Sequence, residues 1–376
     1  PGGALRFQRS WSIGESRPMI ISRTPFRISF FGGGTDYPEW YLRHGGEVLA
    51  TTIDKYCYIT CRYLPPFFEH RFRVVYSQVE ECQVIDEIEH PAVRAILGYL
   101  DIDRGIEIHH DGDLPARSGM GSSSSFAVGL LHALHALKGR ISSRQQLAME
   151  SIHIEQVRLQ ETVGSQDQIL AAHGGFNHVT FFPTGEISIA KMTLPAERVK
   201  DLDDHLVLFY TGIKRTASNI AESYVNDLES RGRQLRSMQD MVREGISILN
   251  SGQDLDLFGR LLDEAWKAKS ELSNLVSNSH VDEIYNLARS AGAIGGKLLG
   301  AGGGGFMMLF VPPSKQNNVK EQLNKLIHIP FKFESAGSQI IYFDQEEDYL
   351  GEEQARAGRT IEAFQEHAET LGETRP

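Results

Sequence analysis

The chain is poor in cysteine and has no long apolar run, and both absences narrow what it can be. Its three cysteines, Cys57, Cys61 and Cys82, include no Cys-x-x-Cys pair. A disulfide scaffold or a zinc site is therefore not expected, and we predict packed thiols in a reducing, cytoplasmic setting. No apolar stretch approaches the length of a membrane span, and residues 1–18 contain no apolar signal core. We therefore predict a protein that neither spans a membrane nor carries a secretion signal.

Positive charge is also scarce. The 376 residues include 38 Lys and Arg against 49 Asp and Glu, which gives a net charge of −11. Without a basic field, nucleic acid is not expected as a main partner. Small anions can still be bound locally by helix N-termini, Mg²⁺ and a few basic side chains. The length allows two domains with a substantial core, and a homo-oligomer is compatible with the sequence, which does not fix the oligomeric state.

Glycine, by contrast, is abundant and gathers in three clusters. The first, at 32–34, follows an expected strand over Met19–Phe31, and the second is Gly119 and Gly121. The third runs from Gly300 to Gly305 and precedes the apolar segment Phe306–Val311. A backbone without Cβ atoms can turn tightly or approach a ligand or another segment closely. For the third cluster, a tight helix-to-strand connection and a functional loop explain the pattern equally well.

The second cluster opens a helix. Ser122 to Ser125 follow Gly121 directly, and apolar residues at helical spacing continue to Leu137. Serine hydroxyls, free backbone N–H groups and the positive end of the helix dipole together favour an anion. An ordinary glycine turn before a capped helix is the alternative. We predict a loop that binds nucleotide phosphates, made of Pro115, Arg117, Ser118, Gly119, Met120, Gly121, Ser122, Ser123 and Ser124.

Other phosphate-binding motifs do not fit this loop. No Lys follows its last glycine, as a P-loop requires, and the glycine spacing is not that of a dinucleotide fold. The His-Arg-Asp and Asp-Phe-Gly motifs of protein kinases are absent as well.

Three motifs in order instead resemble the GHMP small-molecule kinases. They are the segments 24–37 (TPFRISFFGGGTDY), 115–124 (PARSGMGSSS) and 297–306 (KLLGAGGGGF). Within that family, the FGGGTDY segment and the run of four serines look most like D-glycero-D-manno-heptose 7-phosphate kinases. The resemblance implies an α+β, two-domain fold, with a ribosomal S5 domain 2-like N-terminal domain and a ferredoxin-like C-terminal domain. We place these domains at 19–185 and 186–344, between a flexible extension at 1–18 and a charged tail at 345–376.

The resemblance also implies roles for particular residues. ATP and Mg²⁺ are the expected cofactors, with Ser123 and Glu155 as metal ligands, although Ser122 or Ser124 could replace Ser123. Asp167 lies twelve residues after Glu155 and matches the aspartate that faces the acceptor hydroxyl, and Arg27 matches a residue beside the acceptor. A carboxylate can accept a proton from a hydroxyl, so Asp167 is the predicted base and Arg27 its partner.

Acceptor binding is predicted around the first and third glycine clusters. Asp36 matches the acid that binds sugar hydroxyls in related kinases, and stabilising a turn is its alternative role. The predicted acceptor residues are Gly33, Gly34, Asp36, Tyr37, Gly302, Gly303 and Gly304. Arg117, Arg215 and Lys297 are the candidate cations for a substrate phosphate by their position near the motifs; the sequence does not choose among them, and a solvated surface charge is the alternative for each.

Together these features predict an ATP-dependent kinase that phosphorylates the C1 hydroxyl of a heptose 7-phosphate, on a route to nucleotide-activated heptose. Another sugar 1-kinase, acting on galactose or fucose, is the first alternative. A kinase-like sensor that binds nucleotide and sugar without turnover is the second, and the joint presence of Arg27, Ser123, Glu155 and Asp167 favours an enzyme over it.

Overall fold

The computed structural model describes residues 17–65, 68, 70–116, 118–213, 223, 225 and 230–346, and every structural statement below concerns these residues. The predicted N-terminal extension and charged tail lie outside them, apart from two residues at each inner end. Arg17 and Pro18 begin the first strand, and Gln345 and Glu346 end the last one.

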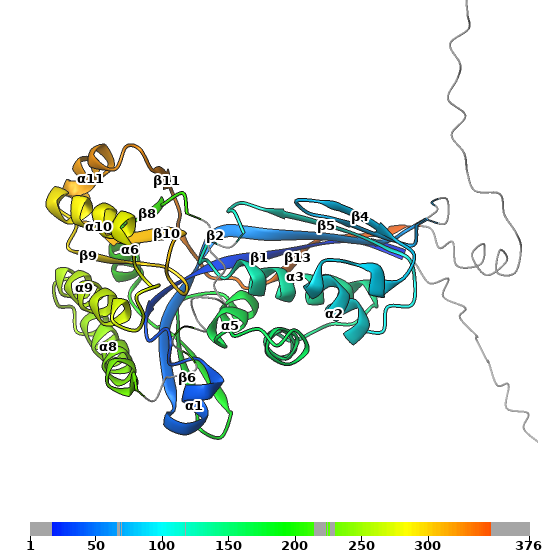
Figure 1. Ribbon diagram of the computed structural model, residues 1–376, viewed down its shortest axis with the longest axis horizontal. Helices are drawn as coiled ribbons and strands as arrows, with labels where there is room; N and C mark the ends of the chain where they lie inside the picture. The colour runs from blue at the N-terminus through cyan, green and yellow to red at the C-terminus, as the bar shows by residue number, and fades with distance from the viewer. Residues whose placement is uncertain are drawn as a thin grey trace, which may run out of the picture.

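A nine-stranded sheet forms the first domain, and two of its strands run most of its length (Figure 1). These are β1 (Arg17–Phe31) and β2 (Gly46–Tyr63), which pair antiparallel. The main strand order is β13-β1-β2-β5-β3-β4, while β6 and β12 also pair with β2, and β7 with β6. The other seven strands are β3 (Phe72–Val75), β4 (Val79–Cys82), β5 (Ile106–Gly112), β6 (Asn177–Phe181), β7 (Ile187–Lys191), β12 (Phe333–Glu334) and β13 (Gln339–Glu346).

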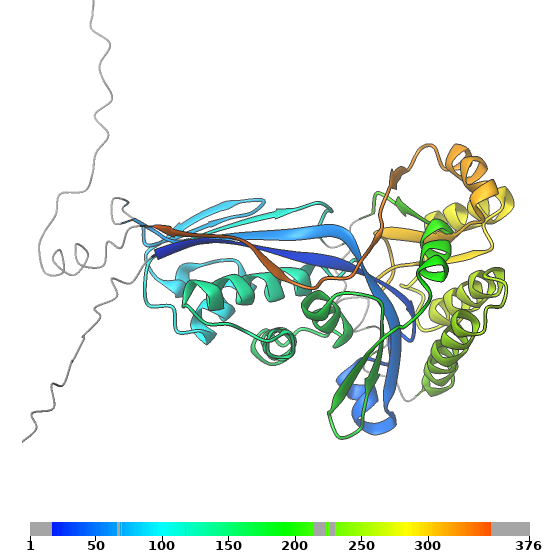
Figure 2. The ribbon, with the colours of Figure 1, turned by 180° about the vertical axis from the view of Figure 1, so that it is seen from behind.

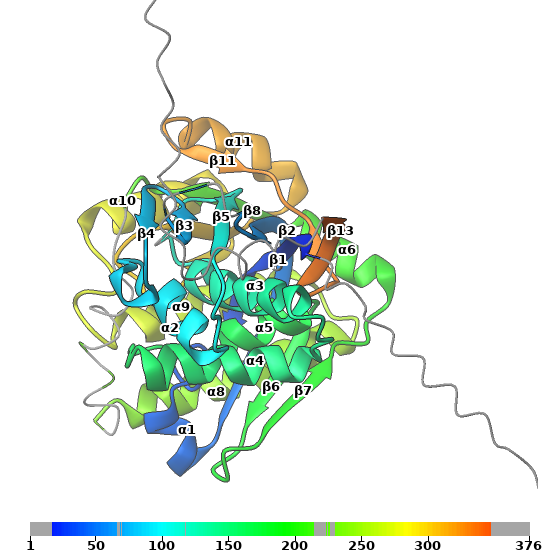
Figure 3. The same ribbon diagram turned by 90° about the vertical axis from the view of Figure 1, so that its right-hand side faces the viewer.

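Helices cover one face of this sheet, as Figure 3 shows end-on. The central one is α3 (Ser122–Leu137), which is nearly all buried against β1 and β2. It approaches the sheet closely at Gly129, where a Cβ would lie 2.9 Å from Thr24 Oγ1 and whose carbonyl accepts a hydrogen bond from Ser22 Oγ at 2.8 Å. The remaining helices of this domain are α1 (Pro38–His44), η1 (Ile85–Glu87), α2 (Pro91–Tyr99), α4 (Arg144–Ile152), the π-helical turn η2 (His153–Arg158) and α5 (Gln166–His173).

The second domain contains a four-stranded antiparallel sheet of order β11-β8-β10-β9. Its strands follow the chain as β8, helices, β9, β10, helix, β11, which is the connectivity of a ferredoxin-like βαββαβ unit. The apolar segment predicted near residue 306 is its fully buried strand β10. The strands are β8 (Leu206–Tyr210), β9 (Gly295–Leu298), β10 (Phe306–Phe310) and β11 (Ile327–Ile329), and the helices are α6 (Ala196–Asp204), α8 (Gly232–Asn250), α9 (Asp256–Ser270), α10 (Ser279–Ala291), η3 (Pro313–Lys315) and α11 (Gln316–Gln322).

The α+β, two-domain fold is thus confirmed, and strands that follow residue 186 pair with the first sheet. Strand β7 pairs with β6 and so belongs to the first sheet, although it follows the predicted boundary at residue 186. Strand β13 crosses back to lie beside β1, with Met19 opposite Asp344 (Figure 2). A sequence boundary could not show this return, because it depends on pairing between the two ends of the chain.

The three cysteines are free thiols, as predicted. Cys57 and Cys61 are buried in β2, and burial raises the pKa of both. Within the described residues, no helix combines the length and apolar character needed to cross a bilayer.

Aromatic packing joins the two domains. The ring of Phe258 on α9 meets those of Phe30 and Phe31 on β1 edge-on, with centroids 5.5 and 5.0 Å apart. The ring of Phe258 also packs near that of Phe310 on β10, with centroids 6.4 Å apart. Edge-to-face contacts at these distances add to the stability gained from burial.

A polar contact beside this cluster also links the domains. The buried carboxylate of Glu47 on β2 accepts hydrogen bonds from Arg243 (Nη2, 2.5 Å) and Gln239 (3.2 Å) on α8. His178 on β6 lies 2.9 Å from its other oxygen. Burial alone would raise the pKa of Glu47, but these hydrogen bonds, first from His178 and then from Arg243, lower it to about 2.

We predict that Glu47→Gln destabilises the protein in a pH-dependent way. A carboxylate with a depressed pKa contributes stability that is fully present above its unfolded pKa and is lost as the pH falls toward about 2. The variant should lose about 1–2 kcal/mol at pH 7, and the difference should shrink below pH 4.5. Chemical denaturation across pH 2.5–7 measures this, with exposed Glu186→Gln as control. A deficit that does not change with pH would contradict this role.

Candidate active site

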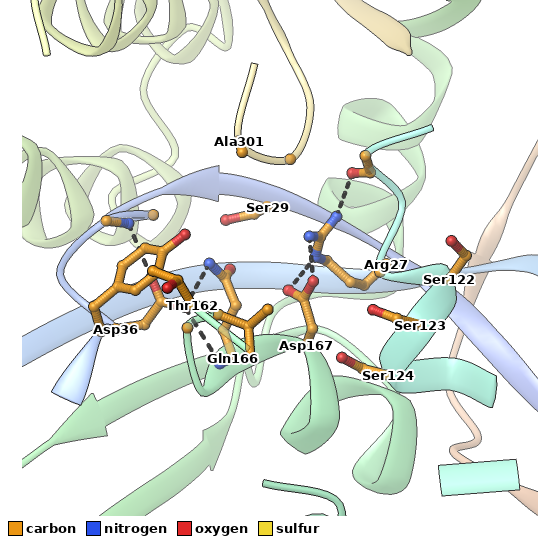
Figure 4. Close-up of a pocket in the computed structure, with 18 of the residues that line it drawn as sticks. Arg27, Ser29, Asp36, Ser122, Ser123, Ser124, Thr162, Gln166, Asp167 and Ala301 are labelled. Carbon is orange, nitrogen blue, oxygen red and sulfur yellow. Dashed lines mark hydrogen bonds and ion pairs between the residues drawn. The ribbon is translucent and has the colours of Figure 1, made fainter. Parts of the chain in front are cut away.

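A cavity of about 270 Å³ lies where the two domains meet. Its walls come from β1, the loop before α1, the first turn of α3, the start of α5 and the loop after β9 (Figure 4). All three motifs therefore converge on one cavity. Its lining residues include Arg27, Ser29, Gly33, Gly34, Asp36, Tyr37, Gly119, Gly121, Ser122, Ser123, Ser124, Glu161, Thr162, Gln166, Asp167, Lys269, Lys297, Gly300 and Ala301.

An ion pair between Arg27 and Asp167 stands at the centre of the cavity (Figure 4). The guanidinium donates from Nε and Nη2 to the two carboxylate oxygens, each at 2.6 Å. Its Nη1 donates to the carbonyl of Gly119, also at 2.6 Å. Because this side chain is only 6% exposed, its planar fork holds the carboxylate in one orientation. The predicted partnership of Arg27 and Asp167 is present.

The predicted phosphate-binding loop at residues 115–124, called the serine loop below, forms one end of the cavity. Gly121 is the residue before α3 and has a φ of +74°, a conformation that favours glycine. Gly119, Gly121 and the next three serines line the cavity, whereas Met120 is fully buried and the hydroxyl of Ser118 donates to the carbonyl of Pro115. Pro115, Ser118 and Met120 thus shape the loop rather than line the cavity, and Arg117 lies outside the described residues.

Contacts between the second and third glycine clusters explain why both need glycine. A Cβ on Gly119 would lie 2.5 Å from the carbonyl oxygen of Leu299, and one on Gly305 would lie 2.1 Å from that of Ser118. The backbones of the two loops therefore touch directly, which fixes the loop after β9 against the serine loop.

Three predicted acceptor residues do not line the cavity. Gly302 and Gly303 pack on Val276, and a Cβ on Gly304 would collide with Ile213. Gly300 and Ala301 line the cavity in their place. Four consecutive glycines look equivalent in sequence, whereas the turn exposes only the start of the loop to the cavity.

The predicted metal ligands Ser123 and Glu155 are not in direct contact. Glu155 lies on the π-helical turn η2 and accepts hydrogen bonds from Ser124 Oγ (2.8 Å) and Gln168 Nε2. Ser124 is thus the serine that contacts Glu155, while Ser123 is exposed at the cavity. Burial, reinforced by Glu161 and Asp167, raises the pKa of Glu155 to about 8.

These oxygens fit a divalent cation such as Mg²⁺. Within the described residues no basic side chain pairs with Glu155, and the amide oxygen of Gln168 is buried without a hydrogen-bond partner. Hydroxyl, amide and carboxylate oxygens are the donors that Mg²⁺ prefers. The same residues hold no group of three or more His, Cys, Asp or Glu suited to a metal, so phosphate and water would complete the shell.

Asp36 marks the opposite end of the cavity. Its carboxylate accepts hydrogen bonds from the backbone of Gly34 (2.9 Å) and the side chain of Gln166 (3.0 Å), and burial raises its pKa. Gly164 packs so closely that a Cβ there would lie 2.0 Å from Asp36 Oδ2. Asp36 thus stabilises its turn and also lines the cavity, beside Tyr37, Gly33 and Gly34.

One lysine in the cavity wall was missed from the sequence alone, and another was given too little weight. Lys269, near the end of α9, was not predicted, and Lys297 on β9 was only one of three candidate cations. Both line the cavity and are 6% and 3% exposed. No motif marks Lys269; only the fold turns this lysine inward. Arg215, the third candidate cation, lies outside the described residues.

We predict that Gly119→Ala destabilises the contact between the two loops. The new Cβ would meet the Leu299 carbonyl, and φ is +82° at this position. A non-glycine residue held there costs about 1–3 kcal/mol, measurable as a lower free energy of unfolding. Gly98→Ala is the control, since a Cβ there meets nothing within 4 Å. Equal stability of the two variants would refute the contact.

Comparison with known proteins agrees with this geometry. The GHMP kinases N terminal domain matches residues 87–175, and the GHMP kinases C terminal domain matches residues 238–328. D-glycero-alpha-D-manno-heptose 7-phosphate kinase of Campylobacter jejuni is 28% identical over 81% of this chain and 93% of that protein.

Solved structures show the same fold. A putative sugar kinase from Campylobacter jejuni superposes with a TM-score of 0.71 at 26% identity, covering 87% of this chain and 98% of that one. A D-glycero-D-manno-heptose 1-phosphate kinase from Bacteroides thetaiotaomicron gives a TM-score of 0.70 at 23% identity, covering 86% and 99%. With both family domains in order and the three motifs around one cavity, the chain belongs to the GHMP kinase family and is a phosphotransferase.

Proposed function

We propose that this enzyme is a sugar kinase that transfers the γ-phosphoryl group of ATP to the C1 hydroxyl of D-glycero-D-manno-heptose 7-phosphate. The product would be a heptose 1,7-bisphosphate for the synthesis of nucleotide-activated heptose. The observation that carries the proposal is the Arg27–Asp167 ion pair, held between the serine loop and Asp36. The similarity to a heptose 7-phosphate kinase supports the choice of acceptor.

Asp167 is positioned to accept the proton of the acceptor hydroxyl. As this proton moves to the carboxylate, the hydroxyl oxygen forms a bond to the γ-phosphorus and the bond from phosphorus to the ADP oxygen breaks. Arg27 fixes the carboxylate and places positive charge beside the transferring group, which becomes more important when water is excluded. An anomeric hydroxyl is more acidic than an ordinary alcohol, which makes this proton easier to remove.

The serine loop is the proposed phosphate-binding end. Ser122, Ser123 and Ser124, at the start of α3, line the cavity, and a helix N-terminus favours an anion. Ser123 or Ser124 and Glu155 would hold Mg²⁺, which when bound neutralises phosphate charge. Binding of a cation near Glu155 would favour its ionised form.

The opposite end is proposed to orient the sugar. The Asp36 carboxylate can accept hydrogen bonds from sugar hydroxyls, and Tyr37 offers a ring for a sugar face. Gly33 and Gly34 carry no side chain that would fill this space. The acceptor would therefore extend from Asp167 toward Asp36.

We predict that Asp167→Asn lowers kcat by about 100-fold or more, because an amide cannot accept the proton. Steady-state assays with coupled ADP detection measure this, and unfolding temperatures confirm that the variant is folded. The exposed Asp111→Asn serves as control and should keep the wild-type rate. A near wild-type kcat for Asp167→Asn would remove the proposed base.

A panel of acceptors tests the substrate. Heptose 7-phosphate should give the highest kcat/KM, with galactose and fucose turned over poorly. Efficient turnover of an unphosphorylated hexose would replace the heptose assignment with another sugar 1-kinase. Binding of ATP and sugar with no ADP release from any acceptor would instead favour a sensor.

A further inference from the structure

Two lysines lie buried in the cavity wall without an acidic partner. Lys297 Nζ donates to the carbonyl of Phe30 at 2.9 Å. Lys269 Nζ donates to the carbonyl of Leu298 at 3.2 Å and to that of Gly300. Within the part of the chain that the structure describes, neither ammonium group forms an ion pair. A buried charge left without a counter-ion is costly.

Each ammonium group has at least one N–H donor that no hydrogen bond to the described residues uses. An ammonium group has three N–H donors, of which Lys297 uses one and Lys269 two, all on backbone carbonyls. The remaining donors belong to side chains that line the cavity. An anion that enters the cavity can therefore bind to both lysines without displacing an existing contact.

The contacts of the lysines show where each lies along the cavity. Arg27 and Asp36 are the charged side chains outside the pair that act on both. Lys297 donates to Phe30, three residues beyond Arg27 on β1 and just before the first glycine cluster, whereas Lys269 donates to Gly300, whose backbone touches Gly119. The serines lie on the far side of the Arg27–Asp167 pair from Asp36 (Figure 4). Lys297 therefore lies toward the acceptor end, and Lys269 lies between the two ends.

The electrostatics of the two lysines favour the binding of an anion. Burial, and then Lys297 and Arg27, lower the pKa of Lys269 well below its ordinary value. Burial and Arg27 lower the pKa of Lys297 to about 7. Asp36 acts in the opposite direction on both but forms no ion pair with either. An anion bound between the lysines would relieve their mutual repulsion and favour the charged form of each.

We propose that Lys269 and Lys297 form the subsite for a phosphate group that the acceptor sugar carries remote from its reacting hydroxyl. This inference rests on the proposed function, since it assumes that Asp167 faces that hydroxyl. The same chemistry could meet a phosphate of ATP, but the contact of Lys297 with Phe30, just before the first glycine cluster, favours the acceptor. The subsite would make the enzyme selective for sugar phosphates over free sugars.

The test compares two acceptors, heptose 7-phosphate and the same heptose without its phosphate, in Lys269→Met and Lys297→Met. Methionine keeps much of the side-chain volume and removes the charge. Each variant should lose about 10–100-fold in the preference for the phosphorylated acceptor, expressed as the ratio of kcat/KM values. The KM for ATP should change little. Lys267→Met, an exposed lysine on the same helix, should behave like the wild type.

The results that would contradict the phosphate subsite differ from those that would contradict the proposed function. Equal losses of kcat/KM on both acceptors would mean that the lysines only support the loop after β9. A raised KM for ATP would mean that the lysines bind the phosphates of ATP. If the wild type turned over no sugar, the proposed function would fail. Calorimetric binding of inorganic phosphate, present in the wild type and lost in both variants, would still support the subsite, and binding unchanged in the variants would overturn it.

A wild-type measurement covers the case in which a variant does not fold. Inorganic phosphate should inhibit the unaltered enzyme in competition with heptose 7-phosphate and not with ATP. Competition with ATP alone, or no inhibition, would contradict the assignment.

Discussion

The site depends on one side chain, Arg27. Its guanidinium binds the Asp167 carboxylate with two N–H groups and the Gly119 carbonyl with a third. A single planar group thereby joins strand β1, the start of α5 and the serine loop, which are far apart in sequence. The backbone of the serine loop in turn touches the backbone of the loop after β9 in the second domain. Displacing Arg27 would therefore disturb the proposed base, the phosphate end and the contact between domains together.

The cavity also gathers positive charge within an acidic protein. The net charge is −11, yet Arg27, Lys269 and Lys297 all line the cavity, and among these three described side chains only Arg27 forms an ion pair, with Asp167. Transfer of a phosphoryl group brings several negative charges into a small space, and fixed cations and a divalent metal offset them. The buried groups are costly without ligands, so we infer that the cavity is organised for anions, not for its own stability.

Much of this could be predicted from the sequence because the informative residues are local. Glycine clusters beside strands, serines at a helix start, and an aspartate in a short polar segment each leave a short motif, so the sequence could single out Arg27, Asp36 and Asp167, which the structure brings to one cavity. What the sequence could not show depends on tertiary structure. Successive helical residues point about 100° apart, so only the packing of α3 decides that Ser124 reaches Glu155. Lys269 lies in no motif, and the return of β13 to β1 is a pairing of distant segments.

A crystal structure of the enzyme with a non-hydrolysable ATP analogue, Mg²⁺ and heptose 7-phosphate would test the central claim most directly. The account predicts that the C1 hydroxyl lies within about 2.6–3.2 Å of the Asp167 carboxylate, with the γ-phosphate at the serine loop. A C1 hydroxyl directed away from Asp167, or nucleotide phosphates bound beside Asp36, would contradict it.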